Sequence, residues 1–207
     1  MALEQELKLS VLEGEIDLKT IVFDGYQQSE VTSQRLISTY FDTSELALIK
    51  NGFGLRLRFD GKQWFQTLKE TGQVKRGLHQ RQEWEQGLLK EAFDEDLLKA
   101  TPLRTLIENE AVWPKVSSVF TTDFIRQIII LRDQSGAQIE VAYDKGRVYT
   151  DVEATPIHEI ELELKAGNVN QLQAIAAHLI SILPLQTSDS SKAGKGYGLL
   201  RPQQFLV

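Results

Sequence analysis

Two segments, one near each end of the chain, repeat the pattern Glu-x-Glu-x-Lys. They consist of Glu4, Glu6 and Lys8 and of Glu161, Glu163 and Lys165. Residues i and i+2 of a strand share one face and lie about 6 to 7 Å apart, so two such strands side by side would gather their glutamates in one patch. Carboxylates this close repel one another, and a hard cation such as Mg²⁺ or Mn²⁺ relieves the repulsion. The pattern therefore predicts a divalent metal site between the two segments.

Basic residues occupy alternate positions of other strand-like segments. Arg56 and Arg58 alternate with leucines, and Arg81 opens a segment that continues with Glu83 and Glu85. A guanidinium can bind phosphate oxygens through two parallel hydrogen bonds, so strands of this kind suit an anion with several charges. Carboxylates for a metal beside cations for a polyphosphate indicate hydrolysis of a phosphoanhydride.

The ionisable faces of several segments favour a common cavity. A single glutamate–lysine pair on neighbouring strands is usually a solvated surface pair that contributes little to stability. Here the polar faces of several segments are almost entirely ionisable, and this repetition is hard to explain by surface pairs alone. If the apolar faces pack beneath helices, the ionisable faces would line the inside of a barrel. The sequence therefore predicts a barrel with a charged lumen.

The strands that would position these residues follow from alternation of apolar and polar residues. They are predicted at residues 3–11, in a segment ending at 38–42, and at 53–59, 64–69, 81–86, 118–132, 138–144 and 157–165. Asn51-Gly52 marks a turn, and Asp60-Gly61 is a strong hairpin signal.

Helices are predicted between some of these strands. The expected helical ranges are 15–27, 91–111 with a break at Pro102, and a helix capped by Asn170 and stopped by Pro184. Asp42-Thr43-Ser44 supplies residues that favour a helix start. The tail at 188–200 is expected to be a short helix or loop that presents Lys192 and Lys195.

The overall composition narrows the class of protein. The chain has 207 residues, 42% of them hydrophobic, and its even composition predicts one domain over residues 1–207. It contains no cysteine, which excludes thiolate metal sites and makes the reducing cytoplasm the expected compartment. The net charge of −6 argues against nucleic acid as a partner. Without a signal peptide or a long apolar run, no membrane association is expected either.

Two other groups of residues do not support a site. The glycines at 194, 196 and 198 beside Lys195 lack the spacing of a phosphate-binding loop. His79, His158 and His178 lack the spacing of metal ligands, and no Ser-His-Asp set can be assembled. Packing or surface roles are expected for these residues.

The charged segments also carry a resemblance to a known family. The landmarks cover nearly the whole chain and are Glu4-Gln5-Glu6-Leu7-Lys8, Tyr40-Phe41-Asp42-Thr43, Leu55-Arg56-Leu57-Arg58, Thr67-Leu68-Lys69, Gly77-Leu78-His79-Gln80-Arg81, the runs 118–126 and 159–165, and Ser191-Lys192-Ala193 followed by Gly196-Tyr197. In these landmarks the chain resembles the CYTH superfamily, the triphosphate tunnel metalloenzymes. Within it, the bacterial inorganic triphosphatases are the most similar branch.

The resemblance implies an α+β fold in which a closed eight-stranded antiparallel β-barrel forms a tunnel with peripheral helices. It implies metal-dependent hydrolysis of tripolyphosphate to pyrophosphate and phosphate inside that tunnel, with Mg²⁺ or Mn²⁺. The implied metal ligands are Glu4, Glu6, Asp144, Glu161 and Glu163. The implied substrate ligands are Lys8, Arg56, Arg58, Lys69, Arg81, Arg126, Lys192 and Lys195. The implied catalytic set is Glu4, Glu6 and Lys8.

Within this set Glu4 or Glu6 is expected to orient or deprotonate the attacking water. Lys165 stands at the end of its strand. We interpret it as a residue that repeats the sequence pattern of Lys8 but does not contact substrate.

Other functions stay open. The same tunnel would serve hydrolysis of thiamine triphosphate or of a nucleotide, or cyclisation of ATP by a class IV adenylate cyclase. A non-catalytic polyphosphate-binding module would keep the cations but tolerate loss of the carboxylates, so the retained glutamates favour catalysis. Related bacterial enzymes often carry a helical CHAD domain after the tunnel. Because this sequence stops at Val207, the chain is expected either to be a single-domain member or to lack such a partner domain.

Overall fold

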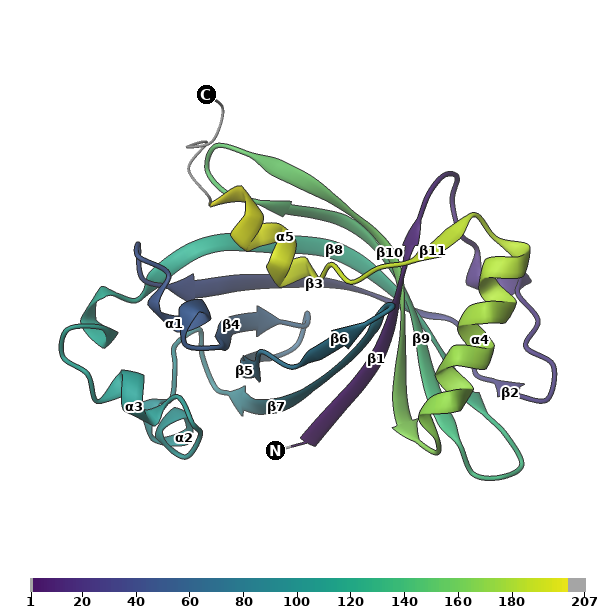
Figure 1. Cartoon of the computed structure of the whole chain (residues 1–207), viewed down its shortest axis with the longest axis horizontal. Helices are drawn as coiled ribbons and strands as arrows, with labels where there is room; N and C mark the ends of the chain where they lie inside the picture. The colour runs from purple at the N-terminus through teal and green to yellow at the C-terminus, as the bar shows by residue number, and fades with distance from the viewer. Residues whose placement is uncertain (1, 201–207) are drawn as a thin grey trace.

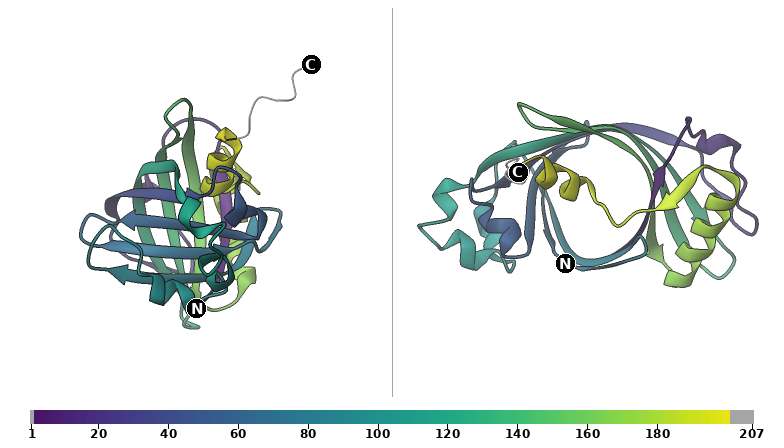
Figure 2. Two further views of the ribbon diagram at one scale, coloured as in Figure 1. Left: turned by 90° about the vertical axis from the view of Figure 1, so that its left-hand side faces the viewer. Right: turned by 45° about the horizontal axis from the view of Figure 1, so that its top comes forward.

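The strand-like segments build one antiparallel barrel. The structure is a computed structural model and describes residues 2–200. In their order around the barrel, the strands are β1 (Ala2–Val11), β10 (Ala154–Ala166), β9 (Gln138–Tyr149), β8 (Ser117–Arg132), β3 (Thr32–Asp42), β4 (Phe53–Phe59), β5 (Trp64–Glu70) and β7 (Leu78–Leu88). β7 pairs again with β1 and so closes the ring. The closed eight-stranded barrel predicted from the sequence is confirmed, and Figure 2 shows the ring of strands.

Shorter elements surround this ring. The short strands are β2 (Gln27–Gln28), β6 (Gln73–Lys75) and β11 (Leu185–Thr187). The helices are α1 (Ala47–Lys50), α2 (Glu95–Lys99), α3 (Arg104–Ile107), α4 (Val169–Ile182) and α5 (Lys192–Leu199), with 3₁₀ turns at Leu18–Thr20 and Trp113–Lys115. Across residues 2–200, no helix combines the length and the apolarity that crossing a membrane requires.

Among residues 2–200, two of three apolar clusters lie outside the barrel, between strands and helices, and the third, which includes Phe124 and Tyr197, lies beneath α5. On one side α4 packs the apolar residues Leu172, Ile175 and Leu179 against β1, β10 and β11. On the other side the short helices α1 to α3 cover a separate apolar cluster that includes Leu55 of β4 and Leu68 of β5. Figure 1 shows these two groups of helices at opposite ends of the molecule. Because the helices bury the apolar strand faces, the ionisable faces remain for the lumen.

Several local predictions are confirmed. The hairpin signal Asp60-Gly61 joins β4 to β5, and Gly61 has a φ of +93°, which a residue with a side chain rarely adopts. The Asp42 carboxylate accepts hydrogen bonds from the backbone N–H groups of Leu48 and Ile49, so Asp42 does stabilise a helix start, although α1 begins only at Ala47. The tail forms a short helix, α5, that carries both predicted cations.

One helix prediction was wrong, and two others differ from the structure in detail. The segment 15–27 contains only the 3₁₀ turn at Leu18–Thr20 and runs otherwise without a helix, because its apolar residues are buried against the core in an irregular chain. The segment 91–111 is helical with the predicted break at Pro102, but its two helices, α2 and α3, cover only part of the predicted range. Asn168, and not Asn170, caps α4, because Asn168 and Gln171 form a reciprocal capping box.

Candidate active site

A cavity of about 900 Å³ runs through the barrel and is lined by most of the predicted site residues. The predicted residues that line it are Glu4, Glu6, Lys8, Arg56, Arg58, Lys69, Arg81, Arg126, Glu161, Glu163 and Lys192. Two further predicted residues, Asp144 and Lys195, lie behind this lining and bond to it through Lys192 and Glu159. The fold therefore brings the predicted site residues together at one cavity, and within residues 2–200 all of them except Arg58 join one connected network of ion pairs.

The two Glu-x-Glu-x-Lys segments are neighbours, as the sequence predicted, but they run antiparallel. Glu6 lies opposite Glu163, and Lys8 lies opposite Glu161. The Lys8 ammonium is bonded to the Glu161 carboxylate and lies 3.0 Å from an oxygen of Glu6. The expected patch of bare, mutually repelling carboxylates is therefore partly neutralised by a lysine from one of the segments themselves.

Glu4 lies at another part of this network, between β5 and β7. Its carboxylate accepts hydrogen bonds from Lys69 Nζ and from Arg81 Nε, both at 2.6 Å. Burial opposes ionisation of Glu4, but the two cations outweigh it and hold the pKa of Glu4 below its ordinary value. Arg81 also donates to Glu6 at 2.5 Å, so one guanidinium bridges two candidate metal ligands.

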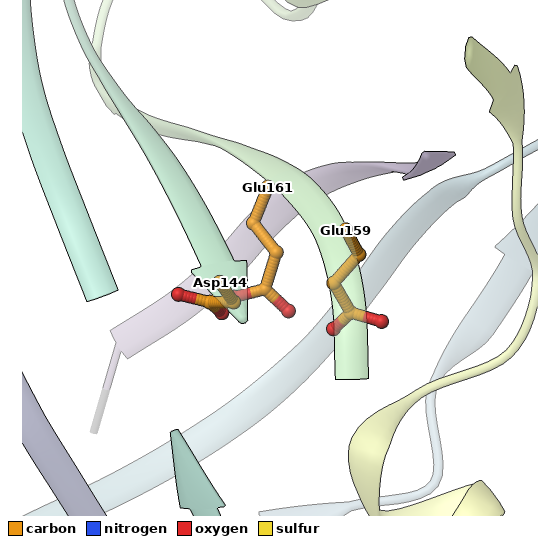
Figure 3. Close-up of side chains that lie close together, drawn as sticks. All are labelled: Asp144, Glu159 and Glu161. Carbon is orange, nitrogen blue, oxygen red and sulfur yellow. The ribbon is translucent and has the colours of Figure 1, made fainter. Parts of the chain in front are cut away.

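A second set of carboxylates gathers where β9 and β10 meet α5. Oxygens of Asp144, Glu159 and Glu161 all lie within 4.8 Å of one another, and Figure 3 shows the three side chains converging. The Lys192 ammonium stands among them, at 2.6 Å from Asp144, 2.5 Å from Glu159 and 2.9 Å from Glu161. Arg126 donates two hydrogen bonds to the Asp144 carboxylate, from Nε to Oδ1 at 2.7 Å and from Nη2 to Oδ2 at 2.6 Å. Each carboxylate in this set is therefore matched by a buried cation.

The charges in this set stabilise one another. Burial would lower the pKa of Lys192, but Asp144, Glu159 and Glu161 raise it above its ordinary value. Burial would raise the pKa of Glu161, yet Lys192, Lys8 and Arg126 hold it well below the usual range. Lys192 and Glu161 are consequently both charged near neutral pH.

Glu159 was not predicted as a metal ligand. It is only 1% exposed and lies opposite Asp144 in the β9–β10 register. The signal was present in the sequence, since Glu159 precedes Glu161 by two residues and so shares its strand face. All-oxygen donor sets of this kind fit a hard divalent cation, so the carboxylates around the lumen are chemically suited to Mg²⁺ or Mn²⁺.

The two predicted arginines of β4 differ in their partners. Arg56 lies 3.6 Å from Glu85 and 3.8 Å from Glu83, and its buried Nε has no hydrogen-bond partner within residues 2–200. Arg58 donates to the Ser38 hydroxyl at 2.9 Å and, within the same described part of the chain, has no carboxylate at ion-pair distance. Burial, and then repulsion from Arg56, lowers the pKa of Arg58 to about 10. This end of the lumen therefore holds positive charge that a bound anion would relieve.

Glu163 differs from Glu161, two residues away. Burial raises the pKa of Glu163 above its ordinary value, although Lys165 lies 2.7 Å from its carboxylate. Lys165 lines the cavity and pairs with Glu163, so its position is that of a counter-ion to this carboxylate. That Lys165 does not contact substrate stays a prediction.

Comparison with known proteins identifies the family of this chain. A family model for the CYTH domain matches residues 2–197. An inorganic triphosphatase of Haemophilus influenzae is 34% identical over 175 residues, which make up 82% of this chain and 47% of that protein. This chain therefore spans about half the length of this curated relative.

Solved structures share the fold at low sequence identity. A Hippeastrum protein, described as a candidate adenylyl cyclase that reveals a dominant triphosphatase activity, superposes with a TM-score of 0.63 at 16% identity, over 94% of this chain and 95% of that one. A candidate adenylate cyclase from Bacillus halodurans superposes with a TM-score of 0.53 at 15% identity, over 94% of this chain and 98% of that one. At these sequence identities, the structural similarity shows that the proteins share the barrel fold and nothing more.

Proposed function

We propose that this chain, which belongs to the CYTH domain family, hydrolyses inorganic triphosphate to pyrophosphate and phosphate with a divalent metal ion. The observation that carries the proposal is the lumen itself, where buried cations and carboxylates alternate around one cavity of about 900 Å³. The similarity to an inorganic triphosphatase of Haemophilus influenzae supports the choice of substrate. We place the enzyme in the cytoplasm because the chain has no cysteine, and we assign it no nucleic acid partner because its net charge is −6.

The cations of the lumen bind the triphosphate in this proposal. Arg58 lacks a carboxylate partner among residues 2–200, so it is available to phosphate oxygens at once. Lys8, Arg81, Arg126 and Lys192 are each held by carboxylates. These four would move from carboxylate oxygens to phosphate oxygens as the substrate enters, because both are anionic oxygen acceptors.

The carboxylates released by this exchange would hold the metal ion. Glu4, Glu6, Glu161 and Glu163 are the predicted ligands, and Asp144 and Glu159 join them from β9 and β10. Bound there, a divalent cation would withdraw negative charge from the phosphoryl group and the leaving group. Mg²⁺ and Mn²⁺ both suit this all-oxygen set.

The remaining chemistry falls to side chains of the chain itself. The cations hold the triphosphate extended and stabilise the charge that develops on the leaving pyrophosphate. Glu4 and Glu6, on the face of β1 that lines the cavity, orient the attacking water and accept its proton. Lys8 stabilises the transferred phosphoryl group beside them.

The test is phosphate release from tripolyphosphate, pyrophosphate, ATP and thiamine triphosphate, each with Mg²⁺, Mn²⁺ or a chelator. The proposal expects turnover of tripolyphosphate with metal and none with chelator. Faster turnover of ATP or thiamine triphosphate would replace the inorganic substrate by an organic one, and formation of cyclic AMP would indicate a cyclase. Tight binding of tripolyphosphate without turnover would indicate a binding module.

A pair of variants controls the test. Glu161→Gln removes a carboxylate from the lumen and is expected to abolish phosphate release. Glu15→Gln removes an exposed carboxylate that pairs with Lys145 outside the lumen, and it is expected to leave phosphate release unchanged. Equal activity of both variants would remove Glu161 from the site.

A further inference from the structure

The helix α5 carries Lys192 into the lumen but is a poor helix by composition. Three of its eight residues, Gly194, Gly196 and Gly198, are glycines, which disfavour a helix relative to alanine. A helix this short is not stable in isolation, so the position of α5 depends on its contacts with the barrel. Those contacts therefore decide where the Lys192 ammonium stands.

The second half of α5 packs on an apolar cluster of the barrel and is further held by a hydrogen bond and an aromatic contact of Tyr197. The Tyr197 hydroxyl donates to Asp42 Oδ2 at 3.2 Å, and the Tyr197 ring meets Phe120 edge-on at a centroid distance of 5.1 Å. Gly196 lies so close to the Phe120 ring that any side chain there would clash. Gly196 and Tyr197 therefore form a close packing contact that holds α5 against β3 and β8.

Asp42, which accepts the hydrogen bond from Tyr197, is itself held rigidly in place. It is fully buried, and its carboxylate also accepts hydrogen bonds from the backbone N–H groups of Thr43, Leu48 and Ile49. These bonds fix Asp42 at the start of α1. A movement of α5 would therefore break the hydrogen bond, because Asp42 cannot move with Tyr197. The pKa of Tyr197 is raised, by burial and then by Asp42, which keeps the hydroxyl protonated as a donor.

Neither Asp42 nor the Tyr197 hydroxyl takes part in the chemistry proposed above. Asp42 does not border the cavity, and although Tyr197 does, its hydroxyl is bonded to Asp42. Tyr197 stands five residues after Lys192, which is about 7.5 Å along a helix. An effect of the hydrogen bond itself on substrate therefore passes through the position of α5.

We propose that Asp42 and Tyr197 are positioning residues that dock α5 on the barrel and so place the Lys192 ammonium at the triphosphate site. This inference rests on the proposed function. When the hydrogen bond is absent, α5 is docked in only a fraction of the molecules, and the affinity for substrate falls by that fraction. The molecules that bind substrate still have Lys192 in place, so their rate of turnover is unchanged.

The test is Tyr197→Phe, which removes only the hydroxyl. We expect KM for tripolyphosphate to rise about tenfold with kcat nearly unchanged. The matched control is Tyr143→Phe, because Tyr143 is also buried and its hydroxyl also contacts a carboxylate, Glu15, at 3.2 Å, but on the outer side of the barrel. An unchanged KM in Tyr197→Phe would overturn the proposal, as would an equal rise in Tyr143→Phe.

A double-mutant cycle separates positioning from a general loss of stability. If Tyr197 acts through Lys192, then Tyr197→Phe has no further effect on KM in a Lys192→Met background. Additive effects would show that Tyr197 acts independently of Lys192 and would overturn the proposal. Gly196→Ala adds a methyl group against Phe120, keeps the hydroxyl, and is expected to raise KM in the same way.

Amide hydrogen exchange gives a readout that needs no substrate. Tyr197→Phe should speed the exchange of residues 192–199 about tenfold, and Tyr143→Phe should leave it unchanged. Unchanged exchange in Tyr197→Phe would overturn the docking role even if the wild-type chain turns over tripolyphosphate. Faster exchange in a chain whose wild type turns over no triphosphate would instead overturn the proposed function and leave the docking of α5 intact.

Discussion

Lys8 of β1 lies opposite Glu161 of β10, and the two side chains are bonded across the strand pair. The relationship arises because two copies of Glu-x-Glu-x-Lys run antiparallel, which sets the lysine of one copy against a glutamate of the other. The lumen is therefore an ion-paired network before any substrate arrives. Its stability and its affinity for ligands depend on the same pairs, and this dependence can be tested.

Glu161 and Glu163 should differ in their effect on stability although they share one strand face. Glu161→Gln leaves Lys8, Arg126 and Lys192 buried with less negative charge, and we expect it to lower the free energy of unfolding by about 3 kcal/mol. Glu163 has a raised pKa, so its charge is unfavourable in the folded chain, and Glu163→Gln should leave the free energy of unfolding unchanged or higher.

Urea denaturation of the two variants beside the wild type measures this difference. Both variants are expected to lose metal-dependent phosphate release, so activity alone does not separate them. A loss of stability of the same size in both would contradict the assignment of Glu161 as the better-paired carboxylate.

Arg58 should be needed for activity but not for stability. It has no carboxylate partner within residues 2–200 and is repelled by Arg56, so Arg58→Gln relieves an unfavourable charge. We expect the melting temperature to stay equal or rise, while kcat/KM for tripolyphosphate falls about 100-fold. Differential scanning calorimetry and phosphate-release kinetics on one preparation check both parts. A lower melting temperature would show that Arg58 has a stabilising partner.

The chain should lose stability on the acid side through Glu4 and Glu161. Their pKa values are lowered in the folded state, so below about pH 5 the unfolded chain binds more protons than the folded one. The stabilisation is complete above the unfolded value of about 4.3 and is lost as the pH falls toward the folded values. Glu163, with its raised pKa, acts in the opposite sense from about pH 4.3 upward.

Chemical denaturation from pH 3 to pH 7 tests this sign. The free energy of unfolding should rise with pH over the acid limb, and Glu4→Gln should flatten that limb. Glu15→Gln serves as the control, because Glu15 is exposed and its pair with Lys145 is open to solvent. A limb that Glu4→Gln leaves as steep as in the wild type would exclude Glu4 as a source of it.

The sequence predicted the barrel because its strands alternate so regularly. In β4, Arg56 and Arg58 alternate with the buried Leu55 and Leu57, and the Asp60-Gly61 turn sets the register with β5. The segment 15–27 was mispredicted because its apolar residues allow a helix, whereas Ile16, Leu18, Ile21 and Phe23 are buried against the barrel without one. Contacts with the rest of the fold thus overrode the local pattern.

The candidate site was predicted in its residues but not in its pairing. Alternation predicted Glu161 in the lumen, and the family resemblance implied that Lys192 binds substrate. Only the strand register and the contacts of α5 set Lys192 among Asp144, Glu159 and Glu161. Asp42 and Tyr197 were visible as family landmarks more than 150 residues apart, and their contact depends on the closed barrel. Contacts between residues so far apart in the sequence depend on the topology of the barrel, and a local sequence pattern does not predict that topology.

Metal and triphosphate should bind cooperatively, because each frees the groups that the other needs. Phosphate oxygens would take Lys8, Arg126 and Lys192 away from the carboxylates, and a divalent cation would take the carboxylates away from these cations. We therefore expect Mg²⁺ to bind about tenfold or more tightly when a non-hydrolysable imido analogue of triphosphate is present, and the analogue to gain by the same factor from Mg²⁺. Isothermal titration calorimetry in both orders measures the two factors, with mixing of Mg²⁺ and analogue alone subtracted. In Lys192→Met one of the competing cations is absent, so Mg²⁺ alone should bind more tightly than to the wild type and the coupling should shrink. Equal Mg²⁺ affinity with and without the analogue would show that metal and substrate do not share these groups.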